Sequence, residues 1–196
     1  MPMHKVTHIK SATVVLPTRD IDTDQIIPAR FLTATSREGF GAHLFHDLRF
    51  HSDGSAIAGF ALNQAAAAGC SVLVAGNNFG CGSSREHAIW ALQDFGIRAV
   101  ISTEIADIFR NNALKNGLLP IIVDEQTHQR LLANPGSEVE IDVASATLRL
   151  ADGQTVAFPI DDFARYCLVE GIDQLGFLQQ RLHDIELFER NRTWTP

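Results

Sequence analysis

The chain is poor in cysteine and in positive charge, and both shortages restrict what it can be. Its 196 residues include only Cys70, Cys81 and Cys167, which cannot all pair and which show no C-x-x-C spacing. We therefore interpret them as reduced thiols and expect a cytoplasmic protein. Lys and Arg total 16 against 23 Asp and Glu, a net charge of −7. This balance argues against a nucleic-acid partner, because such surfaces are basic.

Long apolar stretches are also missing. No run approaches the roughly 20 residues that a membrane-spanning helix needs. The first residues are partly basic but are not followed by the apolar segment of a signal peptide. We therefore expect neither a membrane association nor a targeting segment. With 45% hydrophobic and 20% charged residues, the composition is that of a globular protein, and the length fits a single domain.

Several common catalytic motifs are absent as well. The glycines match neither the P-loop nor the dinucleotide fingerprint, and no G-x-S-x-G nucleophile elbow occurs. Asp20, Asp22 and Asp24 alternate as in a calcium loop, but residues 25–28 lack the glycine that this motif requires. None of the eight histidines has cysteine partners or H-E-x-x-H spacing, so surface or hydrogen-bonding roles are favoured over a metal site.

The most informative segment is Asn77–Ala88, NNFGCGSSREHA. An apolar run at residues 71–75 predicts a buried strand before it, and a helical pattern over residues 84–95 follows. The connecting loop contains three glycines: Gly76, Gly80 and Gly82. A strand, a glycine loop and a helix start direct unpaired N–H groups and the positive end of the helix dipole at one point.

Polar side chains are placed at that same point. Ser83 and Glu86 have the spacing of a capping box, in which each side chain bonds a backbone N–H of the helix start. Ser84 and Arg85 add a hydroxyl and a guanidinium, so a small carboxylate or phosphate would bind well here. The simpler alternative is a capped helix in which Arg85 is a solvated residue of the first turn.

Strand and helix patterns alternate along most of the chain, which predicts an α/β fold with a mixed, partly parallel sheet and flanking helices. Strands are expected at 11–16, 71–75, 97–101 and 118–123, and helices at 62–69, 84–95 and 104–116, the last capped by Thr103. Alternating runs at 138–143, 147–150 and 155–158, with Asp152-Gly153 between the last two, predict a hairpin. Residues from about 161 to 190 form a helical extension with interruptions at Gly171 and Gly176.

The Asn77–Ala88 string resembles the signature of the swivelling domain, or small subunit, of the aconitase superfamily, and most closely that of the 3-isopropylmalate dehydratase small subunits. Two further segments match in the same order, Asp22–Pro28 before it and Phe109–Pro120 after it. The resemblance extends from about Lys10 to Arg190. It implies a single compact β/β/α swivelling domain over residues 1–196.

The resemblance also implies roles for individual residues. Ser83 matches the residue that abstracts a proton from the substrate, with Ser84 beside it and Arg85 binding a substrate carboxylate. Asp24 and Arg37 match two further substrate-binding positions. Local chemistry leaves alternatives open, since Asp24 could form only an Asx turn and Arg37 could be an exposed charge.

Other residues are expected to support or shape the site. Gly80, Gly82 and His87 are expected to support the loop. Phe31 and Leu32 belong to the segment that resembles a substrate-specificity loop, where they could line an isopropyl pocket or only anchor the loop to the core. Cys81, between two glycines, is either a reactive thiol or a small residue that fits a tight turn.

The cofactor and partner follow from the same resemblance. The family's [4Fe-4S] cluster needs three cysteine ligands, which this chain does not supply, and the family's large subunit carries it. We therefore expect no metal on this chain and a heterodimer with a cluster-bearing large subunit.

The implied reaction interconverts 2-isopropylmalate and 3-isopropylmalate, small dicarboxylates of leucine biosynthesis, by dehydration and rehydration. The same chemistry on homoaconitate or on a methyl-substituted malate is a close alternative. A non-catalytic module that binds an anionic metabolite is a third. The enzyme subunit would be inactive alone, whereas the binding module would hold its ligand without a partner.

Overall fold

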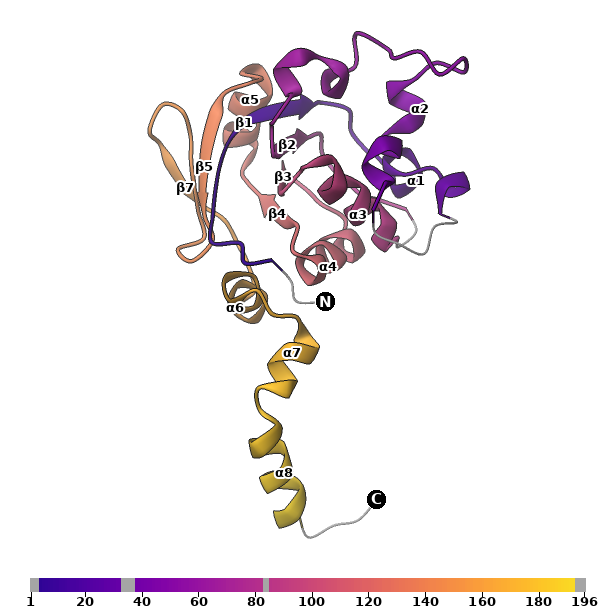
Figure 1. The fold of residues 1–196 in the computed structure, drawn as a ribbon. Coiled ribbons are helices and arrows are strands. Elements are labelled where there is room, and N and C mark those ends of the chain that lie inside the picture. Colours follow the sequence, from indigo (N-terminus) through magenta and orange to yellow (C-terminus); the bar gives the residue numbers. More distant parts are fainter. Residues whose placement is uncertain (1–3, 33–37, 83–84, 193–196) are drawn as a thin grey trace.

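A computed structural model describes residues 4–32, 38–82 and 85–192 of the chain, and its centre is a seven-stranded mixed sheet with the order β4-β3-β2-β1-β5-β6-β7 (Figure 1). Four strands run parallel: β1 (His8–Leu16), β2 (Val72–Ala75), β3 (Ala99–Ser102) and β4 (Leu119–Ile122). Three continue the sheet antiparallel: β5 (Glu138–Asp142), β6 (Thr147–Arg149) and β7 (Thr155–Ala157). The expected mixed α/β fold is confirmed, with Pro120 on the edge strand β4, where its missing N–H costs no sheet hydrogen bond.

Helices cover both faces of the parallel strands. The α-helices are α1 (Thr23–Ile26), α2 (His46–Arg49), α3 (Glu86–Phe95), α4 (Asp107–Asn116), α5 (Glu125–Ala133), α6 (Asp162–Glu170), α7 (Gln174–Gln179) and α8 (Leu182–Asn191). The described parts of the chain also contain four short 3-10 helices, at Ala29–Phe31, Phe40–His43, Ala61–Asn63 and Ala65–Ala67.

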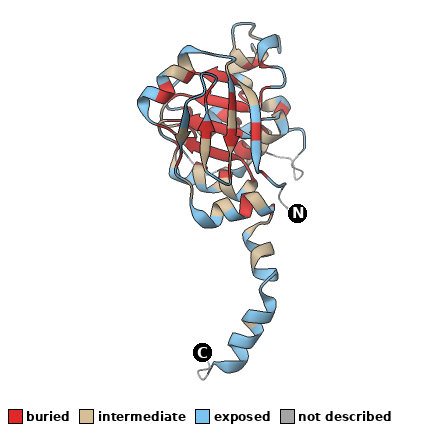
Figure 2. Ribbon diagram, turned by 90° about the vertical axis from the view of Figure 1, so that its left-hand side faces the viewer, coloured by how far each residue is buried: buried red, intermediate tan, exposed pale blue. Residues whose placement is uncertain are grey.

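The alternation of side chains along β2 divides the core into two clusters. Leu73 and Ala75 join α3 and α4 in one cluster, whereas Val72 and Val74 join α5 and α6 in the other. Figure 2 shows the buried residues concentrated in the strands between these layers. Because helices cover both faces of the sheet at β2, every residue of this strand is apolar. This explains the unbroken apolar run from which the strand was predicted.

Two local expectations are wrong, and one helix was not predicted. The alanine-rich segment 62–69 forms two 3-10 turns separated by an extended Gln64, because Leu62 and Ala67 pack into the core from that geometry. The α4 helix begins at Asp107, after Ala106, and Thr103 does not cap it. The helix α5 was not expected, because its sequence EQTHQRLLA is largely polar.

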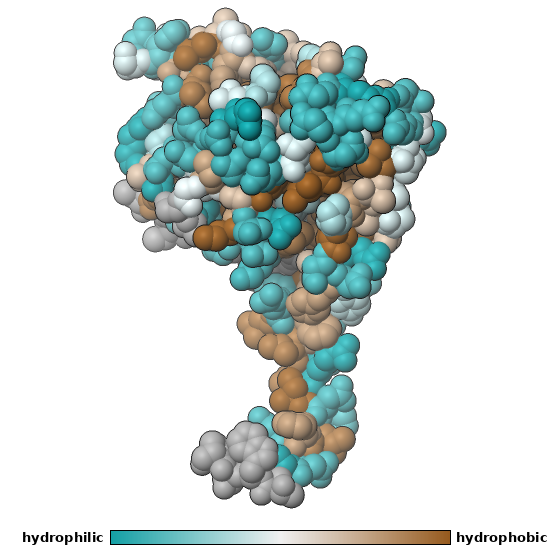
Figure 3. Space-filling view, turned by 180° about the vertical axis from the view of Figure 1, so that it is seen from behind, coloured by the Kyte–Doolittle hydropathy of each residue, from teal (hydrophilic) through white to brown (hydrophobic). Residues whose placement is uncertain are grey.

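The C-terminal helices leave the body of the molecule. α6 packs near the start of β1, where the Val6 N–H donates to the carbonyl oxygen of Leu168 (2.8 Å). α7 and α8 project beyond it and carry exposed apolar side chains (Figure 3): Leu175, Leu178, Leu182, Leu187 and Phe188. The chain breaks at Gly171 as expected, but Gly176 lies inside α7 and the second break comes at Gln180. No helix in the described parts is long and apolar enough to cross a membrane.

Candidate functional site

Three loops meet where β1, β2 and β3 end, at the edge of a parallel sheet where α/β proteins commonly bind ligands. The loop after β2 contains the Asn77–Gly82 part of the signature. Backbone bonds tie it to the loop after β1: Asp20 N–H to Asn77 O (2.9 Å), Gly80 N–H to Ile21 O (2.8 Å) and Thr23 N–H to Cys81 O (3.0 Å).

The loop after β3 is bonded to the opposite side of the signature loop. The Phe79 N–H donates to the carbonyl oxygen of Glu104 (3.2 Å), and the Ala106 N–H donates to that of Phe79 (3.0 Å). These bonds keep residues 104–106 extended, which is why α4 starts later than the sequence pattern predicts. Backbone hydrogen bonds thus fix the signature loop between the two other loops.

Two asparagines reinforce this arrangement. The Asn77 amide donates to Thr103 Oγ1 (3.2 Å) and to Glu104 Oε2 (3.1 Å) on the β3 side. The Asn78 amide donates to Asp20 Oδ1 (2.8 Å) on the β1 side. Asn78 has a φ of 59°, in the left-handed region that asparagine tolerates better than most residues.

The two glycines that follow differ in their surroundings. Gly80 is buried with a φ of 76°, and a Cβ atom there would lie 2.4 Å from Cγ of Phe109. Gly82 is exposed with a φ of 88°, and its nearest neighbour for such an atom is Cβ of Asp22 at 3.5 Å. Gly80 is therefore required by packing and by conformation, and Gly82 by conformation.

The expected capping box at Ser83 and Glu86 is wrong. α3 begins at Glu86 and its N-cap is Arg85, which makes no side-chain capping bond. Ser83 and Ser84 lie outside the described residues. A capping box does form nearby, at α1, where Asp22 Oδ1 accepts from the Gln25 N–H (2.8 Å) and Gln25 Oε1 accepts from the Asp22 N–H (3.0 Å). The sequence signal for it, Asp-x-x-Gln, was present in the chain.

Arg85 and Asp24 form an ion pair across the loops. Their side chains are 20% and 55% exposed, so the guanidinium is largely covered while the carboxylate faces solvent. The pair lies at the positive end of α3, where anions are favoured. A carboxylate ligand would meet Arg85 already oriented for it and would compete with Asp24.

The segment after residue 37 is anchored to α3. The Asp94 carboxylate accepts hydrogen bonds from the N–H groups of Gly39 (3.0 Å) and Gly41 (2.8 Å). His87, in the first turn of α3, contacts the ring of Phe40 edge-on (5.4 Å between centroids) and lies 4.6 Å from that of Trp90. The role of Asp94 was not visible in the sequence, because the residues that it binds are more than 50 positions away. Arg37 itself is among the undescribed residues.

The segment before residue 33 is anchored to α2 and to the 3-10 helix Phe40–His43. Phe31 stacks on His43 with ring centroids 4.0 Å apart, and Phe31 and Leu32 are partly buried against the core. Arg30 forms an ion pair with Asp47, and this hydrogen-bonded contact holds the pKa of the Asp47 carboxyl below its usual range. The structure thus shows both apolar side chains in contact with the body of the protein.

The surroundings of Cys81 disfavour its thiolate form. Burial, and then the carboxylates of Asp22 and Asp20, raise the pKa of its thiol. The backbone of Cys81 pairs with that of Asp22, so the residue fits a tight, bonded turn.

The described residues include no group of three His, Cys, Asp or Glu side chains that could hold a metal ion. Cys70 precedes the amino end of β2, Cys81 follows its carboxyl end, and Cys167 lies in α6. An iron–sulfur cluster needs several thiolates around one point. The cysteines of this chain therefore do not fit such a cluster.

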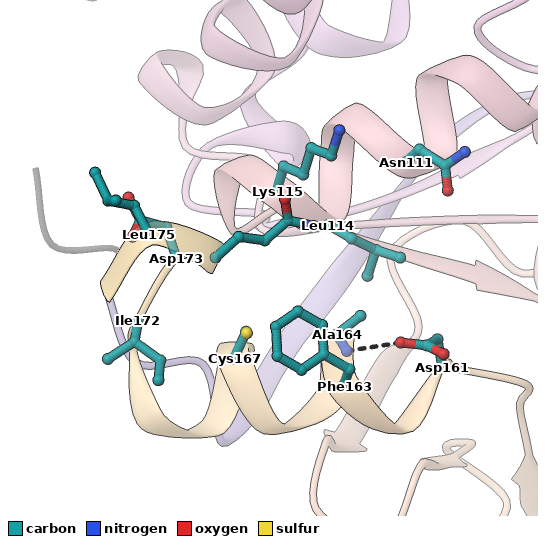
Figure 4. Close-up of a pocket in the computed structure, with 11 residues that line it drawn as sticks. Asn111, Leu114, Lys115, Asp161, Phe163, Ala164, Cys167, Ile172, Asp173 and Leu175 are labelled. Atoms are coloured by element: carbon teal, nitrogen blue, oxygen red, sulfur yellow. Dashed lines mark hydrogen bonds between the residues drawn. The ribbon is translucent and has the colours of Figure 1, made fainter. Parts of the chain in front are cut away.

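A cavity of about 410 Å³ lies elsewhere, between α4, α6 and α7 (Figure 4). Its lining is mainly apolar and includes Leu114, Phe163 and Leu175, with Lys115 on one side. None of the lining residues belongs to the three loops, so this cavity is separate from the signature site.

Comparison with known proteins gives a consistent result. Residues 3–126 match the family described as the aconitase C-terminal domain. The 3-isopropylmalate dehydratase small subunit of Anaeromyxobacter dehalogenans is 60% identical over 97% of this chain and 100% of its own length. That of Roseiflexus castenholzii is 52% identical over 95% and 94%.

A solved structure agrees. The crystal structure of 3-isopropylmalate dehydratase from Methanocaldococcus jannaschii matches with a TM-score of 0.69 and 30% identity, over 91% of this chain and 98% of the other. The match confirms the swivelling-domain fold. With a family match over most of its length and relatives of this similarity, the chain belongs to the aconitase C-terminal domain family, among the 3-isopropylmalate dehydratase small subunits.

Proposed function

We propose that the chain is the small subunit of a hydro-lyase that interconverts 2-isopropylmalate and 3-isopropylmalate in leucine biosynthesis, in the cytoplasm. The observation that carries this proposal is the match to named small subunits over their whole length, in a chain whose signature loop is held at the carboxyl edge of the sheet. The name small subunit implies a large one, and we infer that the active site closes when the two associate.

The isomerisation moves a hydroxyl group between neighbouring carbons. A base removes a proton from one carbon, and the hydroxyl leaves the neighbouring carbon as water. Water then adds back with the two positions exchanged, so that the hydroxyl goes to the first carbon and the proton to the second. A serine is a weak base unless donors and cations stabilise its alkoxide. In this proposal Ser83 abstracts the proton, because it matches the family's proton-abstracting position and comes two residues before Arg85, the N-cap of α3.

Substrate carboxylates need cations and N–H donors. Arg85 supplies a planar guanidinium that can donate two parallel bonds to one carboxylate. We propose that the substrate displaces Asp24 from Arg85, with Ser84 and Arg37 completing the binding site. We propose that Phe31 and Leu32 contact the isopropyl group of the substrate. The Arg30–Asp47 ion pair holds the segment that carries these two residues in place.

The Lewis acid that helps the hydroxyl to leave is, in this proposal, a [4Fe-4S] cluster on the large subunit. The cysteines of this chain do not fit one, and no step assigned here to its residues passes through a metal.

The test is isomerase activity on 2-isopropylmalate, measured for the chain alone and after anaerobic mixing with a cluster-loaded large subunit. Turnover only in the mixture is expected. Ser83→Ala should abolish turnover while the complex still forms, and Ser52→Ala, at an exposed turn, is the matched control that should remain active. Near-normal turnover of Ser83→Ala would refute the role of Ser83.

Other results would separate the alternatives. A complex that forms but acts only on another malate would mean that the substrate is misassigned. Failure to form any complex, together with tight binding of a dicarboxylate by the isolated chain, would favour the anion-binding module.

A further inference from the structure

Two buried polar side chains meet the backbone where β2 ends and the signature loop begins. Ser102, at the end of β3, is fully buried, and its Oγ donates to the carbonyl oxygen of Gly76 (2.9 Å). His128, on α5, is 3% exposed, and its Nε2 lies 2.7 Å from the carbonyl oxygen of Ala75. A carbonyl can only accept, so the imidazole Nε2 carries the proton and donates it.

The bonds of Ser102 and His128 form where the pairing of β2 with β3 ends. β2 pairs with β1 as far as Ala75 opposite Leu16, but with β3 only as far as Val74 opposite Ile101. Beyond Val74 the strand therefore has no ladder partner on the β3 side. A buried carbonyl without a partner is unfavourable, and the hydroxyl and the imidazole supply the missing donors.

Gly76 is held from its other side as well. Its N–H donates to the carbonyl oxygen of Leu16 (2.9 Å). A Cβ atom on Gly76 would lie 2.3 Å from the carbonyl oxygen of Thr18, so the β1 loop fits directly against it. The peptide groups on both sides of Gly76 are thus fixed, and they set the direction in which the signature loop leaves the sheet.

Ser102 also joins two of the three loops. Its Oγ accepts a hydrogen bond from the Glu104 N–H (3.3 Å) while it donates to Gly76. Glu104 in turn accepts from the Phe79 N–H, so a chain of bonds runs from β3 to the middle of the signature loop.

We propose that Ser102 and His128 are positioning residues that orient the Asn77–Gly82 part of the signature loop for catalysis by fixing the carbonyls of Ala75 and Gly76. Neither residue contacts substrate in this proposal, which rests on the function proposed above. A displacement of about 1 Å at a reacting group can cost roughly 100-fold in rate. Loss of either donor should therefore lower kcat about 10- to 100-fold and change KM much less.

The variants are made in the full chain and assayed with the large subunit. Ser102→Ala and His128→Leu remove the donors, and His128→Gln restores an N–H near the position of Nε2. Matched controls remove buried hydroxyls that do not touch the signature loop: Thr13→Val in β1 and Thr127→Val in α5, each 2% exposed in the wild type. The controls should lose stability but keep kcat, and His128→Gln should recover a large part of the kcat lost in His128→Leu.

Amide hydrogen exchange reports how firmly the signature loop is held, and it does not depend on an activity assay. The N–H groups of Phe79 and Gly80 report the bonds that hold the loop, and their exchange should accelerate in Ser102→Ala and His128→Leu but not in the controls. Unchanged exchange in those two variants, or equal losses of kcat in the controls, would overturn the proposal. If the wild-type complex proved inactive on every malate, the proposed function would fail, and the exchange rates would still decide the positioning role.

Discussion

Gly80 offers a quantitative test of how the signature loop is packed. Replacing it with alanine adds one methyl group at a buried position with a φ of 76°. The left-handed conformation costs an alanine about 1–2 kcal/mol relative to glycine. The added Cβ would also meet the Phe109 ring at 2.4 and 2.6 Å, and overpacking of this kind typically costs about 1–3 kcal/mol. The expected loss for Gly80→Ala is therefore about 2–5 kcal/mol of unfolding free energy.

Gly136→Ala is the matched control. Gly136 has a φ of 82°, but a Cβ there would have no neighbour within 4 Å. It should lose only the conformational part, about 1–2 kcal/mol. The difference between the two variants isolates the steric contact with Phe109.

Urea denaturation of both variants measures the two losses. For a protein of this length, each kcal/mol lowers the thermal midpoint by about 2–4 °C, so melting curves give an independent check. The decisive measurement is Gly80→Ala in a Phe109→Ala background. This background removes the two ring contacts but keeps the contact with Cβ of residue 109 at 2.8 Å, so the cost should fall by about 1 kcal/mol and not vanish. Equal costs for Gly80→Ala and Gly136→Ala, or no coupling to Phe109, would refute the packing described here.

Two further predictions concern titratable groups. Asp142 accepts hydrogen bonds from the Ser145 N–H (2.7 Å) and hydroxyl (2.8 Å), which lower the pKa of its carboxyl. Its stabilising effect should thus be complete above about pH 4 and disappear as the pH falls through the lowered pKa. Urea denaturation should show that Asp142→Ala is less stable than the wild type at pH 7, with a gap that narrows below pH 4, and a constant gap would contradict this. Burial and the carboxylates of Asp22 and Asp20 raise the pKa of the Cys81 thiol, so its alkylation by iodoacetamide at pH 7.5 should be slower than that of a cysteine in an unfolded peptide. Mass spectrometry measures both rates, and equal rates would show that these surroundings do not suppress the thiolate.

Much of the fold was predictable because its signals are local. The apolar run of β2, the glycine that ends α4 and the Asp-Gly hairpin each act within a few residues, through periodicity or backbone conformation. Gly117, for example, adopts a φ of 84° at the end of α4, which other residues adopt at a cost. The segments where prediction failed are those where contacts distant in sequence compete with local preference, as where Phe79 keeps residues 104–106 extended.

The sequence by itself determined the family and the strand, glycine loop and helix start of the signature. Only the tertiary structure decided which side chains serve that loop. Asp24 meets Arg85 across 61 positions, and His128 reaches Ala75 across 53. These contacts exist because parallel strands bring their carboxyl ends to one edge of the sheet and because helices pack over both faces. Such pairings depend on strand order and helix placement, which no local pattern of residues encodes.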